Sequence, residues 1–568
     1  MRSQPATGGD ARPPGRGLYP VAALAAALVF VGAAQAAPGR RAVAPGRVVF
    51  PVDGGVTTAN VDGGRATQAV GLPNGGAVLV GGSGHAQKTF YAAALTSTGS
   101  LDRGFGTGGV ARVTVGSQVV PLQLLRQPDG KLIVVASNGF EHQPLVVVRL
   151  NANGGLDQTF GSGGLATTPI TPACDGCTTA ALAPDGGIVL TGETSGSGAN
   201  SWALTRLTAS GAVDQTFGHE GVETVPADDA GGYDVAVLGD GDIVTMGVAS
   251  LAAGHTSIAM VTRLTPLGLS EPDFNGGTPA ELPPGSGAFA MLVYPDGSVL
   301  IGGSAALYRY TSVGALDPTF GTAGVARVGT LPFPLQLLPA AGGAVVALGP
   351  PAGSTSSLSA IRVAADGSVD PSLGGPTGAL YQPPFGGGRS SLVSSLRPRP
   401  LAPLAQNSFV DGSVAIRADG SYLAVGGVGI AQPTGEGEGR SIFDFAALAL
   451  TPGLTPDTRF GGPAKRLTMK LGVVAQTART AASRHGIRVR VDLSAPGLAR
   501  VTVRAHGRVV GQSLLPIFGS GPRTLPVELT SFGASLLRGH DDVHVRATAT
   551  GRDLVAATAH ATAAGTLR

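Results

Sequence analysis

The sequence contains little cysteine and little charge, and each scarcity excludes a class of protein. Its 568 residues include two cysteines, which excludes a scaffold built from many disulfides. Charged residues make up 13% and hydrophobic residues 43%, which excludes a chain kept unfolded by its charge. No apolar run after residue 37 approaches the roughly 20 residues of a transmembrane helix. Motifs such as G-x-S-x-G, H-E-x-x-H and the phosphate-binding loop are also missing, so the sequence predicts no catalytic, cofactor-binding or metal-binding residues and no cofactor.

The N-terminus has the pattern of a secretory signal. Three arginines precede an apolar run from Val21 to Ala34, and the run ends in the small-x-small pattern Ala34-Gln35-Ala36. We predict that residues 1–36 are a signal peptide and that the mature chain is secreted or extracellular, which is compatible with association with the cell surface. The alternative is an uncleaved anchor, because residues 18–37 are just long enough to span a bilayer.

The abundant residue is glycine, with 90 copies, and it belongs to a repeated phrase. The phrase has the form Arg-Leu-x-x-x-Gly-x-Leu-Asp-x-x-Phe-Gly-x-x-Gly-Val and is clearest at 149–165 and 206–222. Its acidic residue recurs seven times, at Asp102, Asp157, Asp214, Glu271, Asp317, Asp370 and Asp457. The steps between these acids are 55, 57, 57, 46, 53 and 87 residues.

A second signal lies midway between the phrases. Turns such as Pro128-Asp129-Gly130 are followed by short apolar runs rich in β-branched residues, as at 132–135, 188–190, 299–301 and 423–425. Each period then holds four short strands that form one antiparallel sheet. Four-stranded sheets repeated about every 55 residues predict a β-propeller, here with seven blades over residues 37–464.

The phrase Leu-Asp-Gln-Thr-Phe-Gly-Ser-Gly-Gly at 156–164, with Arg149-Leu150 and the Pro-Asp-Gly turn, resembles the delta-60 repeat family of bacterial exported proteins. The resemblance covers about residues 47–462. It implies a propeller-like array and no particular activity. The departures are Glu271 for Asp, Leu373 for Phe, and Ala94 and Ala449 where the strand arginine belongs.

An arginine stands eight residues before the acid in five of the seven units. These arginines are Arg149, Arg206, Arg263, Arg309 and Arg362. A substrate site would be unique, whereas these pairs recur, so we expect the arginines and acids to be structural and to bind each other or turn backbone groups.

Other features are less specific. Cys174 and Cys177 are predicted to form a loop disulfide, with redox or zinc chemistry as alternatives. The long 87-residue step predicts an insertion at about 375–411, either a mobile loop or a partner-binding one. His540-Asp541-Asp542 with His544, and Asp240 with Asp242, are weak metal candidates that we interpret as solvated or turn residues.

The C-terminal part differs from the array in both pattern and charge. Alternating runs such as 487–491 and 501–504 predict half-buried strands, and residues 465–568 are expected to form a β-sandwich that weakly resembles immunoglobulin-like modules. This segment holds 15 Lys+Arg against 5 Asp+Glu, while residues 37–464 hold 21 against 30. The asymmetry indicates attraction to an anionic polymer or docking of one part on the other, and the preference for arginine over lysine also fits a GC-rich genome.

The sequence therefore predicts an all-β, exported, non-catalytic binding or surface-interaction scaffold. The expected partner is an extracellular ligand or surface polymer, and no nucleic acid or membrane span is expected in the mature chain. The alternative is a secreted hydrolase or lyase on a propeller scaffold, since fold alone does not decide activity.

Overall fold

The structure is a computed structural model, and it describes most of the chain from residue 47 onward. The described residues are 47–48, 56–58, 65–82, 88–115, 119–137, 143–173, 180–194, 201–227, 230–250, 257–329, 331, 334–349, 358–370, 379–381, 414–432, 440–453, 457, 459–460, 468–493, 497–517, 521–553 and 558–568. The chain divides into two units, Met1–Ala44 and Pro45–Arg568, and the first lies wholly outside the described residues. The signal-peptide prediction and both cysteines also fall outside them. No helix in the described part is long and apolar enough to cross a membrane.

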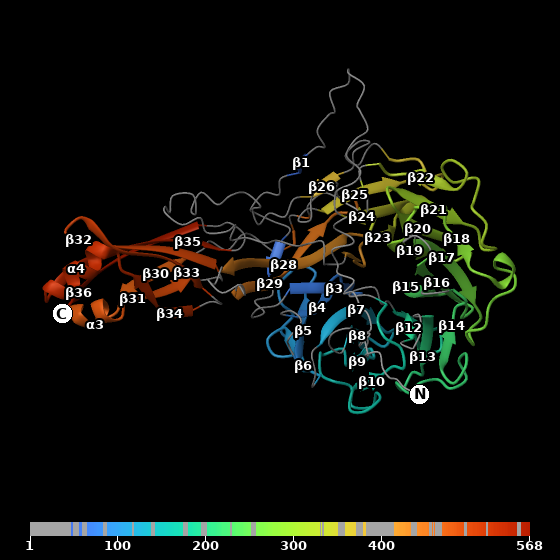
Figure 1. Ribbon diagram of the computed structural model, residues 1–568, viewed down its shortest axis with the longest axis horizontal. Coiled ribbons are helices and arrows are strands. Elements are labelled where there is room, and N and C mark those ends of the chain that lie inside the picture. The colour runs from blue at the N-terminus through green and yellow to red at the C-terminus, as the bar shows by residue number, and fades with distance from the viewer. Residues whose placement is uncertain are drawn as a thin grey trace, which may run out of the picture. The chain divides into compact units, whose positions relative to one another are not determined.

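Residues 65–450 form an all-β array of small antiparallel sheets, as the repeat predicts (Figure 1). The first two sheets consist of β3 (Arg65–Gly71), β4 (Ala77–Gly82), β5 (Thr89–Leu95) and β6 (Val110–Thr114), then β7 (Val120–Arg126), β8 (Leu132–Ser137), β9 (Val146–Leu150) and β10 (Leu165–Thr167). The third and fourth consist of β11 (Ala180–Leu182), β12 (Ile188–Thr194), β13 (Ser201–Leu207) and β14 (Val222–Thr224), then β15 (Ala230–Val237), β16 (Ile243–Ser250), β17 (Ser257–Leu264) and β18 (Ala280–Glu281). The fifth consists of β19 (Ala290–Val293), β20 (Val299–Gly303), β21 (Ala306–Tyr310) and β22 (Val325–Arg327).

The last two sheets of the array recruit strands from the N-terminal segment. The sixth sheet consists of β23 (Gln336–Pro339), β24 (Val345–Gly349), β25 (Leu358–Val363) and β26 (Ala379–Tyr381), with β1 (Arg47–Val48) added in parallel to β26. The seventh consists of β27 (Val414–Ile416), β28 (Tyr422–Gln432) and β29 (Arg440–Leu450), and β2 (Val56–Thr58) supplies its fourth strand. Two 3-10 helices, η1 (Asn275–Gly277) and η2 (Ala341–Gly343), lie in turns. Within the predicted insertion at about 375–411, residues 379–381 are a strand paired with β25, and the other residues of that range lie outside the described part of the chain.

The apolar runs after the midway turns are central strands of these sheets. Strand β8 is buried along its whole length and pairs with β7 on one side and β9 on the other. A strand with two neighbouring strands and both faces covered has no polar side, which explains the unbroken apolar runs.

From the first sheet to the sixth, each sheet shares a hydrophobic core with the next one. Phe90 and Val134, for example, belong to one core between the first two sheets, and Trp202 and Val235 to one between the third and fourth. The sixth and seventh sheets are joined by the Gln336 side chain, which accepts from the Val414 amide at 2.7 Å and donates to its carbonyl at 2.6 Å. The seventh sheet then packs on the first, so orange β28 lies beside blue β3 in Figure 1.

The glycines of the phrase are required by backbone geometry. Gly211 has a φ of +90°, and a Cβ there would lie 2.8 Å from the Phe160 ring of the preceding repeat. Gly161 has a φ of +52°, and a Cβ there would lie within 2.1 Å of the Leu165 carbonyl oxygen. The glycine content therefore comes from tight turns that also touch the neighbouring sheet.

Residues 468–568 form two antiparallel sheets that share one hydrophobic core. One sheet consists of β30 (Met469–Val473), β31 (Gly486–Leu493) and β34 (Gly521–Glu528), and the other of β33 (Arg508–Ile517), β32 (Gly497–Ala505), β35 (Val543–Asp553) and β36 (Thr558–Leu567). Two helices, α3 (Ala478–Ser483) and α4 (Ser531–Gly539), were not anticipated. Their first turns are capped by the Thr477 and Thr530 hydroxyls, which accept from backbone amides three residues on.

Candidate functional site

The repeated phrase builds the same backbone turn in all seven units. In each, the amide of the acidic residue donates to the carbonyl of the residue eight positions earlier, at 2.8–3.0 Å. This bond forms from Ala94 and Ala449 as well as from the five arginines. The spacing of eight therefore follows from a backbone hydrogen bond and does not depend on the side chain.

The complete side-chain cluster is clearest around Arg149. Its Nε donates to Asp157 Oδ2 at 2.7 Å, its Nη1 donates to the Ala209 carbonyl of the next repeat at 2.6 Å, and its guanidinium lies 4.5 Å from the centre of the Phe160 ring. Arg149 and Asp157 are both buried. The guanidinium therefore joins an acid, an aromatic ring and the carbonyl of the adjacent sheet. We call this arrangement the guanidinium cluster.

The same cluster recurs in the fifth sheet with nearly the same geometry. Arg309 Nε donates to Asp317 Oδ2 at 2.7 Å and Nη1 to the Ala365 carbonyl at 2.6 Å, and the guanidinium lies 4.6 Å from the Phe320 ring centre. In the third sheet, Arg206 Nη1 donates to the Pro266 carbonyl at 2.9 Å, while its guanidinium is shared between Asp214, at 3.5 Å, and Asp185. In the sixth sheet, Arg362 Nε lies 3.8 Å from Asp370 Oδ2.

Hydrogen bonds to the carboxylates shift their acidity. The Thr159 hydroxyl and the Lys131 ammonium hold the pKa of Asp157 well below its usual range, against the opposing effect of burial. The Thr216 and Thr319 hydroxyls likewise lower the pKa of Asp214 and Asp317. These carboxylates are therefore held in their charged form mainly by threonine hydroxyls of their own phrase, and at Asp157 also by Lys131.

One of the five predicted pairs takes a different partner. The guanidinium of Arg263 binds Asp242 at 2.7 Å and Asp240 at 3.3 Å in the Gly-Asp-Gly-Asp turn, and not Glu271. Asp240 and Asp242 are the weak metal candidates of the sequence, and in the structure both carboxylates bind this arginine. Among the described residues no group of three or more His, Cys, Asp or Glu side chains lies together as metal ligands would.

The seventh unit lacks the strand arginine but rebuilds the cluster from another position. Arg417, in the turn after β27, approaches Asp457 at 3.8 Å and lies 5.2 Å from the Phe460 ring centre. Its Nη2 donates to the Ser97 carbonyl of the first repeat at 2.7 Å, and Arg459 also binds Asp457. The seventh unit therefore also has a guanidinium beside its acid and its aromatic ring, although Ala449 carries none. Sequence analysis missed Arg417, because its place is not set by the phrase.

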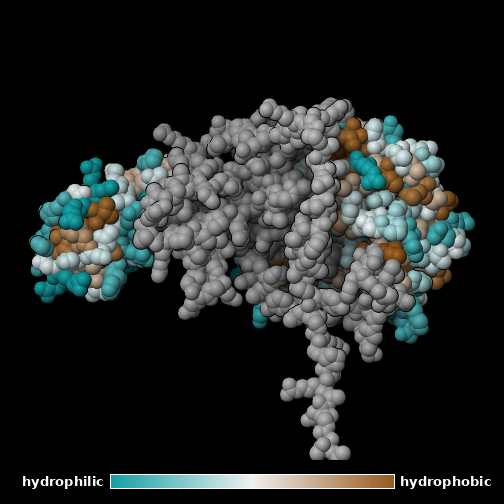
Figure 2. Space-filling model, turned by 45° about the horizontal axis from the view of Figure 1, so that its top comes forward, coloured by the Kyte–Doolittle hydropathy of each residue, from teal (hydrophilic) through white to brown (hydrophobic). Residues whose placement is uncertain are grey.

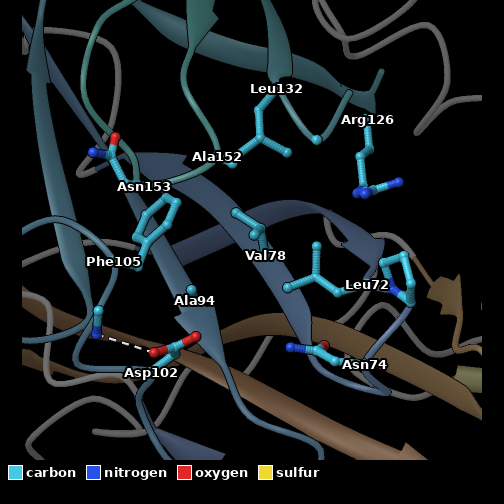
Figure 3. Close-up of a pocket in the computed structure, with 13 residues that line it drawn as sticks. Leu72, Asn74, Val78, Ala94, Asp102, Phe105, Arg126, Leu132, Ala152 and Asn153 are labelled. Carbon is cyan, nitrogen blue, oxygen red and sulfur yellow. Dashed lines mark hydrogen bonds between the residues drawn. The ribbon is translucent and has the colours of Figure 1, made fainter. Parts of the chain in front are cut away.

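The first unit also lacks the strand arginine, and here a pocket of about 480 Å³ remains (Figure 3). Its walls include Ala94, Asp102 and Phe105 of the first repeat, and Ala152 and Arg126 of the second. Asp102 Oδ1 accepts from the Gly104 amide at 3.0 Å, and no ion pair joins Asp102 to any described residue. In Figure 3 the Arg126 guanidinium lies on the far side of the pocket from Asp102.

A second concavity, of about 690 Å³, lies in the C-terminal part and is basic. It is lined by Arg504, His506, His544 and Arg546, with glycine, valine, alanine and threonine. No acidic residue is among its lining residues.

One family of known proteins has a repeat that this chain matches, and several solved structures are distantly similar to it. Residues 127–160, 183–217 and 295–320 match the family described as a "Domain of unknown function (DUF5122) beta-propeller". No curated protein matches the sequence. Similar solved structures are the polysaccharide lyase Uly1 (TM-score 0.38, 10% identity, 68% of this chain and 90% of that one) and a puromycin hydrolase (0.38, 13%, 79% and 61%). Another is Chaetomium thermophilum Sqt1 bound to the N-terminus of ribosomal protein L10 (0.34, 12%, 69% and 98%). The family match shows that the chain carries β-propeller-type repeats.

Proposed function

We propose that the protein is an exported, non-catalytic binding scaffold: a seven-bladed propeller followed by a basic β-sandwich that attracts anionic polymers at the cell surface. Seven successive sheets, six of whose junctions are shared hydrophobic cores, with the last sheet packed on the first, support the propeller. The N-terminal strand β2 would close the ring by completing the seventh sheet. We propose a structural role for the guanidinium clusters, because each joins one sheet to a carbonyl of the next.

The observation that carries the binding role is the outward face of β32 and β35. Arg504 and Arg546 are direct cross-strand partners in these strands, and both are exposed. Like charges placed directly opposite each other destabilise a sheet, so this pair costs stability unless an anion lies between them. His544 extends the same basic concavity.

The surroundings of this face support an anionic ligand. Residues 465–568 carry a net charge of +10, and the array over 37–464 carries −9. In Figure 2 hydrophilic residues surround a smaller hydrophobic patch on the visible part of this module. A concave basic surface concentrates field lines and raises the local concentration of polyanions.

The test compares two double variants in the full-length mature chain. Arg504→Gln/Arg546→Gln removes the paired arginines, and the control Arg488→Gln/Arg490→Gln removes two exposed arginines from β31 in the other sheet, with the same change in net charge. On an immobilised anionic polysaccharide such as heparin, we expect the wild type and control to be retained and the first variant to elute earlier. Retention should fall steeply above roughly 0.15 M salt, where screening is strong.

Three outcomes would count against the proposal. Equal losses in both variants would mean that net charge alone attracts the polymer. No retention of the wild type at low salt would leave docking of the basic module on the acidic array as the better account of the charge split. Shortening of the retained polymer during the assay would favour the alternative of a secreted hydrolase or lyase.

A further inference from the structure

We propose that the pocket between the first and second sheets binds a guanidinium group supplied from outside the chain, as in arginine. The starting observation is that the pocket occupies the place where other repeats hold their own guanidinium. Ala94 stands at the position of Arg149 and Arg309, as its backbone bond to the amide of Asp102 shows. The proposal concerns the array and does not depend on the basic module.

The groups that hold a guanidinium elsewhere remain in this pocket. Asp102 corresponds to Asp157, and Phe105 to Phe160. Ala152 corresponds to Ala209, whose carbonyl accepts from Arg149 Nη1 at 2.6 Å. All three residues line the pocket, so it is bordered by the residues that correspond to the carboxylate, ring and turn carbonyl of the guanidinium cluster. This is the set that a guanidinium needs for a charge-assisted hydrogen bond, a stacking face and a further acceptor.

No described cation of the chain occupies the site. The lysine that binds Asp157 in the second sheet, Lys131, is replaced by Gly76 in the first. The seventh unit shows what internal replacement looks like, because Arg417 reaches Asp457, Phe460 and the next carbonyl from a different backbone position. The corresponding turn position in the first unit is Leu72, which lines the pocket but cannot donate.

The remaining walls define the shape of the ligand. Leu72, Val78 and Leu132 form an apolar middle that suits the methylene chain of an arginine side chain. Arg126 lies opposite Asp102 and could pair with a carboxylate at the other end of the ligand (Figure 3). Its position is apolar in the equivalent strands, as Leu182 and Val237 show, so this basic wall is particular to the pocket. The guanidinium could come from free arginine or from an arginine side chain of a polypeptide.

The experiment measures binding of two probes to the full-length mature protein by calorimetry. L-Arginine represents the free amino acid, and N-acetyl-L-arginine amide represents a residue within a chain. L-Citrulline is the control ligand, because it has the same shape with a neutral urea in place of the guanidinium. We expect arginine to bind at one site and citrulline to bind at least about 10-fold more weakly, since hydrogen bonds to a charged group contribute roughly 1.5–3 kcal/mol. Binding of both arginine probes would identify a polypeptide side chain as a sufficient ligand, and binding of L-arginine alone would identify the free amino acid.

Variants separate this site from non-specific association. Ala94→Arg restores the internal guanidinium and should abolish binding, and Asp102→Asn should weaken it at least about 10-fold. Asp102→Asn keeps the acceptor for the Gly104 amide, so it remains informative if Ala94→Arg fails to fold. Equal binding of arginine and citrulline, or unchanged binding in Asp102→Asn, would overturn the proposal. Binding that appears only in Arg126→Leu would also overturn it, because Arg126 would then fill the pocket itself.

Discussion

The buried pair of Arg149 and Asp157 allows a prediction with an internal control. Replacing Asp157 by Asn keeps an oxygen for the Thr159 amide and hydroxyl but removes the charge that Arg149 Nε contacts at 2.7 Å. Removing one partner of a buried ion pair typically costs about 3–5 kcal/mol. Arg149 retains the Ala209 carbonyl and the Phe160 ring, so we expect a loss of about 2–4 kcal/mol in the free energy of unfolding.

Asp102→Asn is the matched control for this substitution. Asp102 holds the same place in its phrase and has no arginine partner, and Asn can still accept from the Gly104 amide. We expect its cost to stay below about 0.5 kcal/mol. Urea unfolding of both variants gives the comparison, with an unchanged m-value as the check that one transition is observed. Equal costs in the two variants would refute the view that the guanidinium cluster stabilises the junction between sheets.

Three further predictions follow from backbone geometry, acidity and processing. The folded-state pKa values of the phrase aspartates Asp157, Asp214 and Asp317 are lowered. Their contribution to the free energy of unfolding is therefore present above the unfolded pKa of about 3.9 and is lost as pH falls below it. The urea midpoint should drop between roughly pH 4 and pH 2. Gly211→Ala should cost more than 1 kcal/mol in the same assay, because φ is +90° and the Phe160 ring lies 2.8 Å from the added Cβ, whereas Gly239→Ala, with no atom within 4 Å, should cost less. Mass spectrometry of the exported chain should find Ala37 as its first residue, and a membrane-bound chain that retains Met1 would favour the uncleaved anchor.

The sequence predicted those parts of the fold that local backbone geometry determines. The eight-residue spacing, the midway turns and the buried runs recur because each unit repeats the same hydrogen bonds, such as the Asp157 amide to the Arg149 carbonyl at 2.9 Å. The capped helix α4 was not predicted because its nine residues include Gly533 and Gly539, and glycine has a low helix propensity. Strand β2 was missed because Val-Thr-Thr carries no phrase, and its partner β29 lies almost 400 residues away in the sequence.

The side-chain partners were less predictable than the spacing. Arg263 selects Asp240 and Asp242 because the turn before β16 brings two carboxylates to it, whereas the phrase offers Glu271. Arg417, in the turn after β27, takes the place of the strand arginine that is missing at position 449. Such choices depend on which turns become neighbours after folding, and a repeat pattern contains no record of that.

The two units without a strand arginine therefore make opposite predictions for the same substitution. At Ala94 a new arginine would enter a pocket that already offers Asp102, Phe105 and the Ala152 carbonyl, and we expect Ala94→Arg to raise the free energy of unfolding by about 1–2 kcal/mol. At Ala449, which is fully buried, Arg417 already occupies the equivalent place, so Ala449→Arg should overpack the junction and destabilise it by about 1–3 kcal/mol. Urea midpoints measured side by side would decide. Destabilisation by both substitutions would mean that an arginine at position 94 does not reach Asp102 and Phe105 as Arg149 reaches Asp157 and Phe160.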